Sequence, residues 1–267
     1  MSVQTLYTAA TGMQALETKL DVIANNLANV NTSGFKKGRV NFEDLFYRHE
    51  VLPGTEQNGT RTATGTSIGL GTRVSSVQID HKQGAFQQTG NALDVAIEGG
   101  GFFQVTDPLT SETLYTRSGN FAINANGDLV LGSGSSGRPL SPAINIPEGS
   151  TNVSIALNGQ VSYQTPGQTP LSQAGTLQMA NFINPQGLLK IGENLFRESD
   201  ASGTASPGDP GTNGLGVVVQ NALEASNVEP VQELIDLITT QRSFELNSQA
   251  VQAGDQVLQQ IANLRRL

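Results

Sequence analysis

The sequence lacks cysteine and tryptophan, and aromatic residues make up only 5% of its 267 positions. The missing cysteine excludes disulfide bonds, thiolate metal sites and a cysteine nucleophile. Positive charge is also scarce, with 15 Lys and Arg against 23 Asp and Glu and a net charge of −8. This balance argues against nucleic acid as a partner, because phosphate binding needs clustered positive charge. Charged residues amount to 14%, below the roughly 25% of most soluble domains, which is typical of secreted bacterial surface and filament proteins.

Long apolar runs are missing too. No segment reaches the roughly 18 apolar residues of a membrane span, so no membrane insertion is expected. The first residues, MSVQTLYTAATG, have neither a basic region nor an unbroken apolar stretch, so they do not form a cleavable signal peptide. The protein therefore either stays in the cytoplasm or leaves by a route that cleaves no signal.

An unbroken heptad pattern near the N-terminus predicts a long helix. The gaps between apolar residues alternate between three and four, and no Gly or Pro interrupts the run from Met13 to Val30. Gly34 follows as a natural helix stop. The apolar positions are Leu6, Ala9, Met13, Leu16, Leu20, Ile23, Leu27 and Val30.

A second helix is expected at the C-terminus. Pro230 suits the first turn of a helix, and four apolar residues then recur every seven positions, at Leu237, Phe244, Val251 and Leu258. A heptad seam at each end of the chain predicts a coiled-coil-like pair of helices.

This pair is too small to be stable by itself. Ordering one backbone residue costs roughly 1–2 kcal/mol, whereas a buried seam residue returns only about 1.5–3 kcal/mol. We therefore expect the helices to pack on the rest of the chain or against other copies of it, and we favour the second. The predicted assembly seam consists of Leu6, Met13, Leu16, Leu20, Ile23, Leu27, Leu237, Phe244, Val251 and Leu258.

The middle of the chain alternates short apolar runs with turn residues. Asn126-Gly127 and Asn158-Gly159 each separate two such runs, and Asn-Gly in this setting is the strongest short signal of a β-hairpin. Gly99 to Gly101 form a further turn between two apolar runs. The expected fold is α+β, with residues 1–33 and 226–267 forming a helical domain, 34–73 an extended or looped connection, and 74–225 a central all-β domain of hairpins.

Two glycine motifs imitate enzyme signatures but lack their structural context. Gly132 to Gly137 match G-x-G-x-x-G, yet Pro139 and Pro142 exclude the helix that a dinucleotide site requires. Gly65 to Gly69 match G-x-S-x-G, but no helix follows as the esterase motif demands. Both are expected to be loops.

Histidine does not suggest a reactive site either. His49 and His81 are the only two, without ligand-spaced carboxylates around them, and are expected at the surface or hydrogen-bonded. We predict no catalytic, cofactor-binding or metal site, and no enzyme activity.

Three asparagines lie on the predicted N-terminal helix, off its apolar seam, although Asn is a poor helix former. Asn25, Asn26 and Asn29 could form an ordinary polar face. They could instead hydrogen-bond to a neighbouring helix in a packed array, where a charge would not be tolerated. We predict the second, as inter-subunit polar contacts.

Several separated motifs resemble the bacterial flagellar rod and hook family, and they cover essentially the whole chain. The N-terminal run from Asn25 to Lys36 resembles that family's signature, and the run from Glu224 to Val228 resembles its C-terminal counterpart. Further similar segments are residues 94–99, 115–121, 192–196, 233–235 and 240–245.

This resemblance implies a structural protein of the flagellar basal body. Family members leave the cell through the type III apparatus without signal cleavage, their terminal helices form the inner tube of a helical rod, and the β-domain forms its outer layer. The implied partners are further copies of the chain, other rod proteins, the hook protein and the surrounding ring proteins. The rod crosses the periplasm and transmits torque from motor to hook. Residues 46–68 match a segment linked to the stiffness of the rod.

Three alternatives remain at this point. A rod subunit from another position along the rod would share most of these motifs. A β-rich extracellular enzyme would need a convergent acid/base or metal group, which we do not find. A secreted coiled-coil adhesin would carry its heptads in one continuous stalk rather than at both termini.

Overall fold

The computed structural model describes residues 3–54, 56–57, 60–61, 63–132, 137–167 and 170–264. The chain divides into two compact units, and the predicted α+β class is confirmed. The helical unit comprises residues 1–28, 38–79 and 229–267, and the β unit comprises 29–37 and 80–228. Most of the Gly132–Gly137 motif lies outside the described residues, so its expected loop is not tested.

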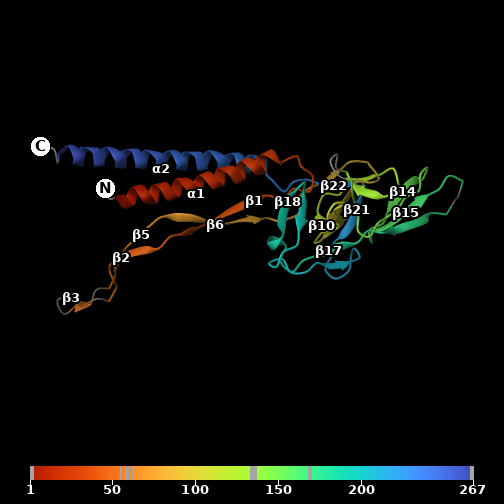
Figure 1. Ribbon diagram of the computed structural model, residues 1–267, viewed down its shortest axis with the longest axis horizontal. Helices are drawn as coiled ribbons and strands as arrows, with labels where there is room; N and C mark the ends of the chain where they lie inside the picture. The colour runs from red at the N-terminus through yellow and green to blue at the C-terminus, as the bar shows by residue number, and fades with distance from the viewer. Residues whose placement is uncertain are drawn as a thin grey trace. The chain divides into compact units, whose positions relative to one another are not determined.

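Both predicted helices are present, as α1 (Val3–Ala28) and α2 (Pro230–Leu264). They run antiparallel and side by side within the helical unit (Figure 1). A Cβ atom built on Gly254 would lie 2.5 Å from Cδ2 of Leu6, and one built on Gly12 would lie 3.2 Å from Nδ2 of Asn247. Glycine at these two positions therefore lets the helices approach closely.

A long β ribbon completes the helical unit. Strand β1 (Gly38–Asp44) pairs antiparallel with β6 (Thr72–Ile79), and both contact α1. A side chain at Gly71, just before β6, would collide with Thr11 of α1. The ribbon continues away from the helices (Figure 1) through the pairs β2 (Tyr47–Val51) with β5 (Thr66–Gly69), and β3 (Glu56–Gln57) with β4 (Thr60–Arg61).

The connection expected over residues 34–73, extended or looped, is extended in most of its described part, where it forms paired strands. Val40 pairs with Val77 and Phe42 with Val74, so each strand meets a partner more than thirty residues away. Pairing over that distance leaves no local sequence signal. It also moves the start of the β unit from the expected residue 74 to residue 80.

The β unit is built around a six-stranded sheet in the described residues, with the order β18-β19-β10-β9-β17-β20. Phe103, Val105 and Met179, which lie on its central strands, are buried in the hydrophobic core. The strands are β9 (Phe102–Thr106), β10 (Thr113–Thr116), β17 (Met179–Asn181), β18 (Leu189–Gly192), β19 (Leu195–Arg197) and β20 (Ser206–Gly208), and the short helix η1 (Pro185–Gly187) precedes β18.

Smaller sheets surround this one, and both predicted Asn-Gly hairpins are confirmed. Gly127 and Gly159 have φ values of 85° and 81°, the left-handed backbone that such turns require. The hairpins join β11 (Phe121–Ile123) to β12 (Leu129–Leu131) and β14 (Thr151–Ile155) to β15 (Gln160–Gln164). Further strands are β7 (Phe86–Gln88), β8 (Val95–Glu98), β13 (Arg138–Pro139), β16 (Ser172–Thr176), β21 (Val217–Gln220) and β22 (Ala222–Glu224).

The glycine turn at residues 99–101 does not close a hairpin. Strand β8 before it pairs with β21, whereas β9 after it pairs with β10 and β17. Gly99 and Gly101 have φ values of 106° and 121°, so the turn passes the chain from one sheet to another. The apolar runs on its two sides give no sign of this, because both are buried in one core.

Candidate assembly site

The predicted seam lies where the helical unit packs on itself. Ile23 is buried, and the other nine seam residues are partly buried; none of them is exposed. The two helices therefore cover much of this seam within one chain, by pairing with each other along their length. A role for the same residues in contacts between copies stays a prediction.

The face of α2 that carries the seam also contains residues that are not apolar, and the apolar periodicity does not reveal them. Glu233, Thr240, Asn247 and Gly254 recur every seven residues, and three of them are buried while Asn247 is partly buried. They alternate with the apolar seam residues of α2 at spacings of three and four, so together they form a complete heptad face. The signal that could have found these residues is their own seven-residue recurrence in the sequence.

Asn26 links three elements of the helical unit. Its Nδ2 atom donates to the carbonyl oxygen of Gly38 at 2.9 Å and to Oε2 of Glu233 at 3.2 Å, and its Oδ1 accepts the Gly38 N–H at 2.9 Å. With 3% of its surface exposed, this amide is committed within the chain. A contact between copies through Asn26 would have to compete with these three bonds. For Asn25, Asn26 and Asn29 alike, the inter-subunit contact stays a prediction.

The opposite side of α2 carries an exposed apolar row, which we call the outer row. Val231, Leu234, Ile235 and Ile238 are 70%, 45%, 49% and 49% exposed. Their spacing of i, i+3, i+4 and i+7 places them on one face of the helix. Large apolar side chains gathered in this way are typical of interaction sites, so the outer row is a candidate contact surface.

The outer part of the ribbon is equally uncovered. Every residue of β2 is exposed, and so are three of the four residues of β5. Phe46, just before β2, is 87% exposed. A two-stranded ribbon without a buried face is only marginally stable in water, so the exposed faces of β2 and β5 are a second candidate contact surface.

Within the β unit, the two terminal sequence motifs meet at a buried group of charges. Nζ of Lys36 lies 2.5 Å from Oε1 of Glu224, and an NH1 atom of Arg117 lies 3.4 Å from Oε2 of Glu224. Burial lowers the pKa of the Lys36 ammonium, and the Glu224 carboxylate opposes that shift. Gly34 and Gly84 donate their N–H groups to the carbonyl and the carboxylate of Glu224, at 2.7 Å and 2.9 Å. Glu224 thus holds three segments of the unit together.

His81, which was expected at the surface or hydrogen-bonded, lies beside this charged group and is partly buried. Its ring centroid is 5.6 Å from that of Phe102 and 5.7 Å from that of Phe196. Burial, followed by the nearby charges of Lys36 and Arg117, lowers the pKa of His81 to about 4. His49, by contrast, is exposed on β2.

The described residues were compared with the requirements of a metal site, a serine nucleophile and a membrane span. No group of three or more His, Asp or Glu side chains there is arranged to hold a metal ion. Ser67 of the G-x-S-x-G motif lies in strand β5, paired with β2 and not in a turn before a helix. Among the described residues, neither helix is long and apolar enough to cross a membrane.

Three family models match separate parts of the chain, near its N-terminus, in its middle and near its C-terminus. Residues 6–36 match the flagella basal body rod protein family, 96–163 the D1 domain of the flagellar hook protein FlgE/F/G, and 219–264 the C-terminal part of the flagellar basal body rod FlgEFG proteins. These models, together with a fold of two terminal helices and a central β region, define a protein of the flagellar rod and hook class.

Relatives that align over almost their whole length narrow the assignment within this class. The flagellar basal-body rod protein FlgG of Buchnera aphidicola (subspecies Baizongia pistaciae) is 42% identical over 97% of this chain and 98% of its own, and FlgG of Bacillus subtilis is 40% identical over 98% and 99%. The flagellar hook-basal body complex protein FlhP of Bacillus subtilis is 31% identical over 98% and 99%. The chain belongs to the flagellar basal-body rod protein family, and as a member of it is a structural subunit of the rod.

Proposed function

We propose that this chain forms the distal part of the rod, where many copies assemble into a helical shaft that transmits torque from the motor to the hook. Its identity of 40% to FlgG against 31% to FlhP, both of Bacillus subtilis, favours this position in the rod over that of another rod-family member. Within each copy, we propose that α1 and α2 form a coiled-coil-like pair and that the partly buried seam stiffens it.

The outer row is the observation that carries self-assembly. Burying the exposed half of one such side chain in a contact between copies returns about 1 kcal/mol, and each added copy repeats that gain along a filament. The outer row and the uncovered ribbon are different surfaces of one helical unit. When unlike surfaces of identical copies contact each other, the assembly is a ring if the rotation between copies closes and a helical filament if it does not. We propose the filament for this chain.

The same proposal accounts for where the protein acts. We propose that it leaves the cytoplasm through the flagellar type III apparatus without cleavage of a signal peptide and becomes part of the basal body where the rod crosses the periplasm. Other rod proteins, the hook protein and the surrounding rings are its proposed neighbours there.

Replacing one residue of the outer row tests self-assembly. Ile235→Asp places a carboxylate in the proposed contact, where it must be desolvated or protonated. We expect a folded, monomeric protein that forms no filaments by electron microscopy at concentrations where the wild type assembles, and non-motile cells. Ser243→Asp is the matched control, because Ser243 is also exposed on α2 but lies outside the outer row.

The two variants separate the possible results. Normal filaments from Ile235→Asp would overturn the role of the outer row. Loss of assembly in both variants would show that added charge anywhere on α2 is harmful, and would also count against the outer row as the specific contact. Circular dichroism of both proteins verifies that the helices and the β unit have formed.

A further inference from the structure

Asparagine followed by glycine is the sequence in which an asparagine side chain most readily deamidates without an enzyme. The backbone nitrogen of the glycine can attack the side-chain carbonyl carbon of the asparagine, provided that this nitrogen is not held in a hydrogen bond and the local backbone can rotate. The sequence holds four such pairs. Asn58-Gly59 lies outside the described residues, and the other three are Asn126-Gly127, Asn158-Gly159 and Asn213-Gly214.

Hydrogen bonds hold the glycine of the first two pairs in place. The N–H of Gly127 donates to the carbonyl oxygen of Asn124 at 3.0 Å, and the N–H of Gly159 donates to that of Ala156 at 2.8 Å. Both glycines are buried. Their carbonyl oxygens accept the N–H groups of Ile146 and Leu177, each at 2.7 Å, so neither peptide can turn without breaking two bonds.

Gly214 is different in each of these respects. Among the described residues its N–H donates no hydrogen bond, and no atom lies within 4 Å of the place where a Cβ would stand. Gly214 and Asn213 are both exposed. The Asn213 carboxamide makes no hydrogen bond within the described residues, and its φ of 50° is left-handed. The two residues are the central positions of a turn closed by the N–H of Leu215, which donates to the carbonyl oxygen of Thr212 at 2.8 Å. Within the described residues, however, no hydrogen bond holds the two reacting groups, the Asn213 carboxamide and the Gly214 nitrogen.

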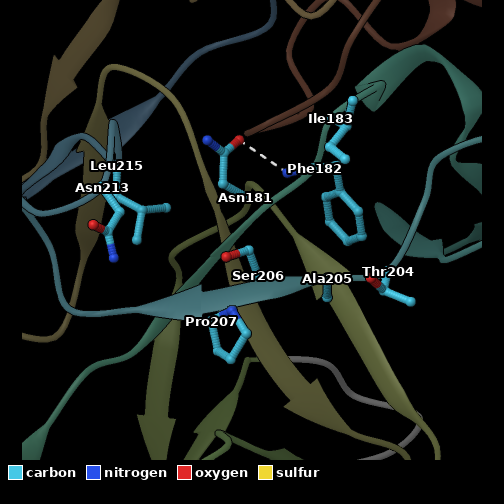
Figure 2. A pocket seen from close by; sticks show the side chains of 9 residues that line it. All are labelled: Asn181, Phe182, Ile183, Thr204, Ala205, Ser206, Pro207, Asn213 and Leu215. Atoms are coloured by element: carbon cyan, nitrogen blue, oxygen red, sulfur yellow. Dashed lines mark hydrogen bonds between the residues drawn. The ribbon is translucent and has the colours of Figure 1, made fainter.

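The Asn213 side chain also lies at a groove that is open to water. Asn213 and Leu215 line one side of a groove of about 480 Å³, and the segment from Thr204 to Pro207 lines another (Figure 2). Figure 2 also shows a hydrogen bond from the N–H of Phe182 to the carboxamide of its neighbour Asn181, whereas none is drawn to Asn213.

We propose that Asn213 is a site of spontaneous deamidation in the folded protein. The nitrogen of Gly214 bonds to Cγ of Asn213, the bond from Cγ to Nδ2 breaks, and ammonia leaves with the proton from the Gly214 amide. Water then adds to one carbonyl of the resulting succinimide ring and opens it to aspartate or isoaspartate. Overall one water is consumed and one ammonia released. The product is about 1 Da heavier and carries one additional negative charge at the groove.

Peptide mapping by mass spectrometry tests this on the full-length protein. One sample is incubated in its native state at mildly alkaline pH, and another is incubated in urea. In the native sample we expect Asn213 to convert at least about tenfold faster than Asn126 or Asn158, because the last two react only after local opening. In urea all three are unfolded Asn-Gly pairs, and we expect their rates to agree within about threefold.

Two variants and two results complete the test. Asn213→Gln removes the five-membered ring and should abolish the product at this position, whereas Asn158→Gln should leave the conversion of Asn213 unchanged. Native rates that are equal at the three positions would overturn the proposal. So would a native protein in which Asn213 is stable although it converts in urea.

Discussion

The ammonium nitrogen of Lys36 lies 2.5 Å from a carboxylate oxygen of Glu224, and neither side chain has any surface exposed to solvent. The two residues are 188 positions apart and belong to the two terminal motifs that identify the family. Arg117 approaches the other carboxylate oxygen at 3.4 Å. A buried charge is tolerated only while its partners remain, because desolvation of an unpaired ion is costly.

Removing the Glu224 charge should therefore destabilise the β unit strongly. Glu224→Gln leaves Lys36 and Arg117 buried without a counter-charge, and we expect a loss of about 3–5 kcal/mol in the free energy of unfolding. Urea denaturation followed by near-ultraviolet circular dichroism measures it. Glu112→Gln is the control, since Glu112 and Arg197 form an exposed pair at 3.9 Å worth no more than about 1 kcal/mol. Equal losses in the two variants would contradict the prediction.

Acid should weaken the β unit through His81. Its pKa falls from 6.5 to about 4 on folding, because burial and the charges of Lys36, Arg117 and Lys190 disfavour the protonated ring. The unfolded chain thus binds the extra proton first as pH falls. The stability that His81 contributes is complete above pH 6.5 and is lost between pH 6.5 and about 4. The partial exposure of the side chain limits this loss to about 2 kcal/mol.

Comparing His81→Phe with the wild type isolates this effect from the titration of the carboxylates. A phenyl ring retains the packing against Phe102 and Phe196 but cannot be protonated. We expect the pH dependence of unfolding to be shallower in this variant over the same window, by urea titration at a series of pH values. His49→Gln, on the exposed ribbon, serves as control. An unchanged slope in His81→Phe would exclude His81 as the cause.

The close approach of α1 and α2 at Gly254 reverses the usual effect of helix propensity. Gly→Ala within a helix normally stabilises by about 1 kcal/mol. Here the new methyl group would meet Leu6 at 2.5 Å, so we expect Gly254→Ala to lower the helical signal and its melting temperature. The double variant Gly254→Ala/Leu6→Ala should recover part of the loss. A gain in stability from Gly254→Ala alone would show that the helices are not this close.

Shortening the ribbon should alter the assembly and leave the subunit intact. Because β2 and its flanking residues are exposed, replacing residues 52–65 with an Asn-Gly turn removes little that stabilises one copy. We expect an unchanged melting temperature of the β unit, together with rods of shorter persistence length by electron microscopy. Straight rods of unchanged stiffness would refute a covering contact on the ribbon. This prediction rests on the proposed function.

Several elements of this protein follow from local signals in its sequence. The heptad from Leu6 to Val30 predicts α1, which ends at Ala28, and Pro230 is the first residue of α2. Asn126-Gly127 and Asn158-Gly159 form the predicted turns, because a left-handed backbone is specified by the turn residues themselves. The motifs at the two ends of the sequence are also enough to indicate the family.

The contacts that these elements make are set by the folded chain as a whole. Folding pairs Val40 with Val77 in the ribbon, and it commits the Asn26 amide to Gly38 and Glu233 within the chain. It also turns the seam of α2 inward and leaves Ile235 outward. Apolar residues recur on both sides of α2, and periodicity alone cannot say which side one copy covers and which side remains for the next. That choice depends on how closely Gly12 and Gly254 let the helices pack, which is a property of two segments more than 200 residues apart.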